Sequence, residues 1–64
     1  PDFDALILML GHEKSEVRIA AAEALGAGGD LRSIEPLFRT CMDDNPRVKS
    51  AARDALASII TRIH

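Results

Sequence analysis

The sequence predicts an all-α fold, a fragment of an α-solenoid built from two helical hairpins with about four helices in all. The stretch VRIAAAEALG at 17–26 returns as VKSAARDALA at 48–57, which is 31 residues later. Of the 64 residues, 47% are hydrophobic, and the chain has two Phe but neither Trp nor Tyr. Its apolar mass is therefore Ala, Leu and Ile at helical spacing, which favours closely packed helices over an aromatic-rich β-sandwich.

The internal repeat covers nearly the whole chain. Residue character is kept between the halves in the pairs Leu6/Leu37, Val17/Val48, Arg18/Lys49, Ala20/Ala51, Ala21/Ala52, Glu23/Asp54, Ala24/Ala55 and Leu25/Leu56. Agreement at core positions, with little elsewhere, is typical of a structural repeat. We therefore expect a single domain over 1–64, with a first repeat over 1–29 and a second repeat over 30–64.

The first repeat is predicted to contain a helix over about 2–10, the turn GHEK, and a second helix from Ser15 to about Ala27. The segment GAGGD at 26–30 ends the second helix, with glycines that can take the left-handed conformation at a helix C-terminus. This segment is not a phosphate-binding loop, because no strand precedes it and a helix C-terminus presents carbonyl groups.

In the second repeat, Asp30 or Ser33 is expected to cap the first helix. With Ser33 as the cap, Pro36 falls in the first turn, where its missing N–H costs little. The segment MDDNP then separates the two helices, with Asn45 as the next cap and Pro46 at the first helical position. The apolar positions expected in the first of these helices are Ile34, Leu37, Phe38 and Cys41. Those expected to be buried in the last helix are Val48, Ala51, Ala52, Ala55, Leu56, Ile59 and Ile63.

The alanines of the first repeat indicate a close contact between helices. Where two helices pack closely, a methyl group fills the contact and a larger side chain separates them. We therefore expect Ala20, Ala21 and Ala24 on the inner seam of its second helix.

The segment DLRSIEPLFRTCMDDNPRVKSAARDAL resembles a short HEAT-like repeat of the kind named after phycobilisome lyases, and EVRIAAAEALG at 16–26 resembles its second helix. The matching elements are the IEPL entry, an Asp in the turn, a Pro before the second helix, and then Val, a basic residue and paired alanines. The first repeat departs from this pattern, because His12 stands where the second has Asp43. The resemblance implies an α-solenoid and little about function, since HEAT arrays serve unrelated ones.

Two repeats leave apolar surface uncovered, because solenoid repeats bury their faces against neighbours and about three are normally required. The first helix is apolar almost all round, and Ile59, Ile60 and Ile63 cannot all face inward. We expect either neighbouring repeats of a longer chain or a homo-oligomer that completes its core through the apolar end faces.

Net charge, cysteine content and hydropathy bear on three questions: nucleic-acid binding, cellular compartment and membrane insertion. The net charge of −2 argues against a dedicated nucleic-acid binder, although residues 1–30 carry −4 and residues 31–64 carry +2. Cys41 is the single cysteine, so no internal disulfide forms and a reducing, cytoplasmic setting is expected. The apolar run at 5–10 follows no basic region and is far shorter than the roughly 20 residues that span a bilayer.

No residue pattern indicates catalysis, a cofactor or a metal site. Cys41 is expected to be a small buried hydrophobe, His12 an exposed turn residue and His64 a frayed end. HEAT-like deoxyhypusine hydroxylase binds iron through His-Glu pairs on the second helices, and here Ile19-Ala20 and Ser50-Ala51 stand at those positions. Asp43 and Asp44 are expected to cap a helix or to pair with a neighbouring repeat, with Arg18 and Lys49 as partners of the turn acids.

We therefore expect a non-enzymatic scaffold or adaptor that binds another protein. The resemblance implies that the second helices line a concave face, and the residues expected to project from it are Glu16, Ile19, Ala22, Glu23, Arg47, Ser50, Arg53 and Asp54. Ile19 is expected to be an exposed apolar anchor among charges. The alternatives are an accessory or tail domain of an enzyme, as in the lyases, and, less favoured, a nucleic-acid binder.

Overall fold

The computed structural model describes residues 2–63, so the expectation for His64 lies outside the described residues. The described chain is all-α, with the helices α1 (Phe3–Met9), α2 (Ser15–Gly28), α3 (Ile34–Thr40) and α4 (Pro46–Ile63) and a 3₁₀ turn η1 (Leu31–Ser33). Helices α1 and α3 begin 31 residues apart, and so do α2 and α4. The predicted fold class and the predicted offset are confirmed.

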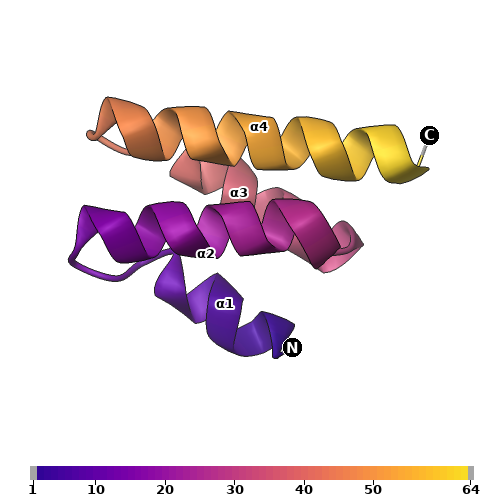
Figure 1. Ribbon diagram of the computed structural model, residues 1–64, viewed down its shortest axis with the longest axis horizontal. Coiled ribbons are helices and arrows are strands. Elements are labelled where there is room, and N and C mark those ends of the chain that lie inside the picture. Colours follow the sequence, from indigo (N-terminus) through magenta and orange to yellow (C-terminus); the bar gives the residue numbers. More distant parts are fainter. Residues whose placement is uncertain (1, 64) are drawn as a thin grey trace.

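Helices α2 and α4 lie side by side and run in the same direction, as Figure 1 shows. Helix α3 lies behind this pair, and α1 lies along the other side of α2. Each hairpin therefore holds one short and one long helix, and the most extensive packing in the molecule is that of α2 on α4. This arrangement leaves the front of the α2–α4 pair uncovered.

The core lies where α2, α3 and α4 meet. Its most completely buried apolar side chains are Ala22, Leu25, Leu37, Val48, Ala52 and Ile59. Ala22 was expected on the concave face and is instead fully buried, whereas Ala20, expected on the seam, is exposed. The buried face of α2 is thus rotated by about one residue from the predicted one, which is roughly 100° about the helix axis.

Two further core predictions are wrong. Phe38 and Ile63 are both more than half exposed, at 63% and 54%. Phe38 lies on the outer side of the second hairpin, and Ile63 lies in the last turn of α4 beside Gly29 and Leu31, which cover it only in part. The rest of the predicted face of α4 is buried, apart from the half-buried Leu56.

The predicted cap of α4 is confirmed, since Asn45 Oδ1 accepts hydrogen bonds from the backbone N–H groups of Arg47 (2.9 Å) and Val48 (3.3 Å). Asp30 caps the 3₁₀ turn η1, which comes directly before α3, and its Oδ1 accepts a hydrogen bond from Arg32 N at 3.0 Å. Ser33 makes no capping hydrogen bond, and its hydroxyl is buried without a partner in the described chain. Asp30, not Ser33, is therefore the cap at this point of the chain.

The glycines at the end of α2 serve close approach and not a left-handed turn. No glycine among the described residues has a positive φ, and Gly29 is extended with φ −73°. A Cβ on Gly26 would lie 2.8 Å from Ala55 Cα, and a Cβ on Gly29 would lie 2.5 Å from the Leu25 carbonyl oxygen. The expected left-handed cap is absent: the extended Gly29 donates its N–H to the Leu25 carbonyl at 2.7 Å, and Arg62 of α4 donates to the carbonyls of Gly26 (2.6 Å) and Gly29 (2.8 Å).

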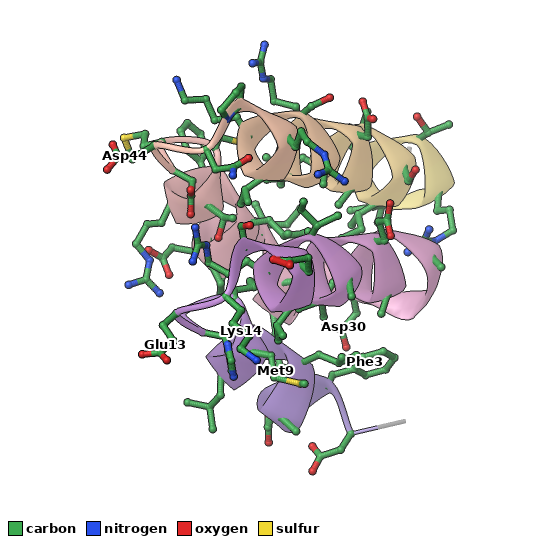
Figure 2. All side chains as sticks on the ribbon, turned by 60° about the vertical axis from the view of Figure 1, so that its left-hand side comes forward. Phe3, Met9, Glu13, Lys14, Asp30 and Asp44 are labelled. Carbon is green, nitrogen blue, oxygen red and sulfur yellow. The ribbon has the colours of Figure 1, made fainter. Side chains whose placement is uncertain are left out.

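We predict that Gly26→Ala lowers the free energy of unfolding by about 1–3 kcal/mol, because the added methyl group forces α2 and α4 apart. Gly28→Ala is the matched control, since its Cβ would meet only the Phe3 ring at 3.5 Å, an ordinary contact. Figure 2 shows Phe3 reaching toward this end of α2. We expect this control to be neutral or stabilising by up to about 1 kcal/mol. Urea unfolding followed by circular dichroism measures both, and equal effects would contradict the close-approach argument.

We also predict that Ser33→Ala raises the free energy of unfolding by about 1 kcal/mol, because it removes a buried hydroxyl that has no hydrogen-bond partner. Thermal or urea denaturation measures the change. A loss of stability would mean that the Ser33 hydroxyl is satisfied in solution.

Candidate functional site

A continuous groove runs along the uncovered front of the α2–α4 pair. Its first part is lined by Ile19, Glu23, Arg47, Ser50, Ala51 and Asp54. Its second part is lined by Glu23, Gly26, Ala27, Ala51, Asp54, Ala55, Ser58 and Arg62. Because the two parts share three lining residues, they form one groove with a floor of small side chains and a charged rim.

The groove brings together five of the eight residues predicted to project from the concave face, namely Ile19, Glu23, Arg47, Ser50 and Asp54. Glu16 and Arg53 are exposed, but neither lines the groove. Ile19 is half-buried and packs against the core, so it is less exposed than expected. The groove therefore combines small apolar side chains with polar ones, and Ile19 is not an exposed apolar anchor in it.

Two carboxylates stand in the middle of the groove. Glu23 and Asp54 occupy equivalent positions of the two repeats, and both are exposed. Neither makes an ion pair or a side-chain hydrogen bond within residues 2–63. Arg47 lies toward one end of the groove and Arg62 toward the other. The groove thus has an unneutralised acidic centre with basic ends.

Glu16 lies just beyond the Arg47 end of the groove. Hydrogen bonds from the backbone N–H at the start of α2 and from the Ser15 hydroxyl, with the Arg47 guanidinium nearby, hold the pKa of Glu16 below its usual value. This carboxylate therefore stays ionised and forms part of the charged rim next to the groove.

Sequence reasoning missed Arg62 and Ser58 as groove residues. A cation in the last turn of a helix usually interacts with the carbonyls of its own helix. Arg62 instead binds the carbonyls at the end of α2, 36 positions earlier in the chain at Gly26. The one available signal was the helical spacing of Asp54, Ser58 and Arg62, which puts them on a single face of α4.

An ion pair joins the two hairpins at the opposite end of α2. Arg18 Nε lies 2.8 Å from Asp43 Oδ2, and Arg18 Nη1 donates to the carbonyls of His12 (2.8 Å) and Glu13 (3.0 Å). Figure 2 shows the loop of Glu13 and Lys14 and the loop of Asp44 at the same end of the molecule. The expected pairing of Arg18 with a turn acid is confirmed, whereas Lys49, for which the same was expected, makes no ion pair within residues 2–63.

Asp43 also organises its own turn, because its Oδ1 accepts a hydrogen bond from Asn45 N at 2.9 Å. This backbone hydrogen bond and the Arg18 guanidinium hold the pKa of Asp43 below its usual value, although partial burial opposes them. Asp43 is thus ionised at neutral pH and belongs to the framework that fixes the two hairpins, not to the groove.

The remaining polar candidates do not gather into a chemical site. His12 is exposed, and its Nδ1 accepts from Lys14 N at 3.0 Å, while Cys41 is half-buried against the core instead of fully buried. Within residues 2–63, no three His, Cys, Asp or Glu side chains lie together in a way that would hold a metal ion. None of the helices described is both long enough and apolar enough to cross a membrane.

The comparisons with known proteins agree with this architecture. A family model described as HEAT repeats matches residues 3–61, which is nearly the whole chain. No curated protein and no solved structure matches the sequence.

We predict that Asp43→Asn lowers the free energy of unfolding at pH 7 by about 2 kcal/mol, because Arg18 loses its charged partner at a mostly buried site. Glu35→Gln is the control, since it breaks the exposed Arg39–Glu35 pair and is expected to cost at most about 0.5 kcal/mol.

The pH dependence follows from the lowered pKa of Asp43. Its contribution to stability is fully present above the ordinary carboxyl value of 3.8 and is lost as the pH falls through the lower value of the folded state. The difference between wild type and Asp43→Asn, measured by urea unfolding, is therefore expected to be constant near neutrality and to shrink in acid. A difference that grows in acid would contradict this account.

Proposed function

Because the chain belongs to the HEAT-repeat family, we propose that it is a scaffold or adaptor module that binds a partner protein along the groove between α2 and α4. HEAT repeats commonly mediate protein–protein interactions, which supports the general role. The observation that carries the proposal is the convergence of Ile19, Glu23, Arg47, Ser50 and Asp54, from both long helices, on this one groove.

The groove favours an extended segment of the partner. Its floor is made of small residues such as Gly26, Ala51 and Ala55, so a peptide backbone can approach the helices closely. Ile19 adds apolar surface at one end, where it packs against the core. A segment lying along the groove would contact both helices at once, and this makes its orientation specific.

The charges of the groove favour a basic side chain in that segment. The carboxylates of Glu23 and Asp54 have no cationic partner within residues 2–63, so an incoming Lys or Arg between them would form charge-assisted hydrogen bonds without displacing an existing pair. Acidic side chains on either side of it would meet Arg47 and Arg62. We infer a partner segment with a basic centre.

As a scaffold or adaptor, the module would have no catalytic role of its own, in keeping with a family that is typically a non-catalytic scaffold. We also propose that the module works in the cytoplasm, because Cys41 is a free thiol with no second cysteine in this chain to pair with.

The proposal predicts that Ser50→Trp weakens partner binding, because the indole fills the groove from an exposed position without disturbing the core. The probe is a random peptide library selected on the immobilised wild-type chain, and titration of the enriched peptides gives their affinity. We expect Ser50→Trp to weaken binding by more than about tenfold, which is 1.4 kcal/mol.

Arg53→Trp is the matched control, since it adds the same indole to an exposed position of α4 outside the groove and is expected to leave affinity unchanged. Circular dichroism checks that both variants stay helical. Peptides that bind Ser50→Trp as well as wild type, or a library from which nothing is enriched, would overturn the groove as the binding site.

A further inference from the structure

The second hairpin carries an outer face that matches a buried face of the first. Leu10 and Leu25 of the first hairpin are buried where the second hairpin packs on it. The equivalent positions of the second hairpin are Cys41 and Leu56, which are only half-buried. Together with the exposed Phe38 and Ile60 and with Lys49, which is equivalent to Arg18, they form what we call the outer face.

We propose that His12 and Ala57 keep a second copy of this chain from stacking on the outer face, which leaves that face as the docking site for a helical hairpin of the same repeat type that carries a carboxylate at the position of Asp43. This surface is separate from the groove between α2 and α4, so the proposal stands or falls independently of the proposed function.

The contact between the two hairpins shows what such a partner must supply. The second hairpin gives Arg18 the carboxylate of its turn residue, Asp43, at 2.8 Å, and it covers Leu25 with apolar side chains of α3 and α4. Lys49 stands where Arg18 stands one repeat earlier, and it makes no ion pair through its side chain within residues 2–63. A hairpin with a carboxylate at the position of Asp43 would give Lys49 the same partner.

A second copy of the chain offers the apolar part of this contact. The second hairpin buries Leu37, Val48, Ala51 and Ala55, and the first hairpin carries the equivalent Leu6, Val17, Ala20 and Ala24, all of them less buried. The opposite net charges of residues 1–30 and 31–64 would also favour head-to-tail approach. On apolar surface and net charge alone, the chain would stack on itself.

In a second copy, the turn of the first hairpin would present His12 to Lys49 where the contact within the chain has a carboxylate. His12 occupies the position of Asp43, and its Nδ1 accepts from Lys14 N at 3.0 Å just as Asp43 Oδ1 accepts from Asn45 N at 2.9 Å. The imidazole therefore keeps the turn intact but offers Lys49 of another copy no negative charge. The one acid in that turn, Glu13, stands at the position of Asp44, which makes no ion pair within residues 2–63, so a second copy would leave the ammonium group without the partner that Asp43 gives Arg18.

Ala57 adds a steric obstacle, because it stands where the first hairpin has Gly26. A Cβ at Gly26 would lie 2.8 Å from Ala55 Cα and 2.9 Å from Ala55 Cβ, distances at which a neighbouring helix has to move away. If a second copy stacked on the first with the same geometry, the methyl group of Ala57 of the first copy would meet Ala24 of the second copy in this way. Together, His12 and Ala57 oppose head-to-tail growth that the apolar surface would otherwise allow.

The test compares the self-association of the wild-type chain with that of the double variant His12→Asp, Ala57→Gly by sedimentation velocity over about a hundredfold range of concentration. A reductant keeps Cys41 from forming disulfides between chains. We expect the wild type to remain near its monomer mass of 6.9 kDa. We expect the double variant to associate at least about tenfold more strongly and to grow past the dimer, because a head-to-tail contact does not close on itself.

Lys49→Glu in the double-variant background identifies the face, since it should reverse the gain while circular dichroism shows unchanged helicity. If Ala57→Gly costs too much helix stability, His12→Asp alone carries the test and should give a smaller gain that salt weakens. Three results would overturn the proposal: strong association of the wild type, no gain in a helical variant, or a gain that survives Lys49→Glu.

Discussion

The close approach of α2 to α4 is the constraint on which the rest of the structure depends. A glycine on one helix faces an alanine on the other, and even one added methyl group would lie 2.8 Å from the opposing backbone. This spacing lets Arg18 reach Asp43 at one end of α2 and lets Arg62 reach the carbonyls of Gly26 at the other. Small residues at the centre therefore make the polar bridges at both ends possible.

The same constraint shapes the groove. Helices that pack through small side chains leave a shallow channel between them, and long polar side chains at its edges become the rim. The carboxylates of Glu23 and Asp54 stand on equivalent turns of the two helices because the sequence repeat and the structural repeat have the same period. A surface that binds along two repeats at once thus arises from the repetition itself.

The sequence predicted the number of helices, their starting points and most of the core, because the offset of 31 residues aligns apolar positions in both halves. It did not predict which alanines of α2 are buried, since Ala20 and Ala22 are chemically identical and only tertiary packing distinguishes them. The resemblance to HEAT-like repeats, which implies that the second helices line a concave face, predicted five of the groove residues. Arg62 was missed because its hydrogen bonds join positions far apart in the chain, which no local pattern encodes.

The two arginine bridges have a consequence for how the molecule unfolds. Helices α1 and α3 contain seven residues each, too few to persist alone, so each hairpin draws its stability from its neighbour. Arg18 and Arg62 bind across the two hairpins at opposite ends of α2. These contacts make the coupling between the repeats strong relative to the intrinsic stability of each repeat. Amide protons in the middle of α2 and α4 should therefore exchange with solvent through one common opening event, with the two hairpins behaving as a single cooperative unit.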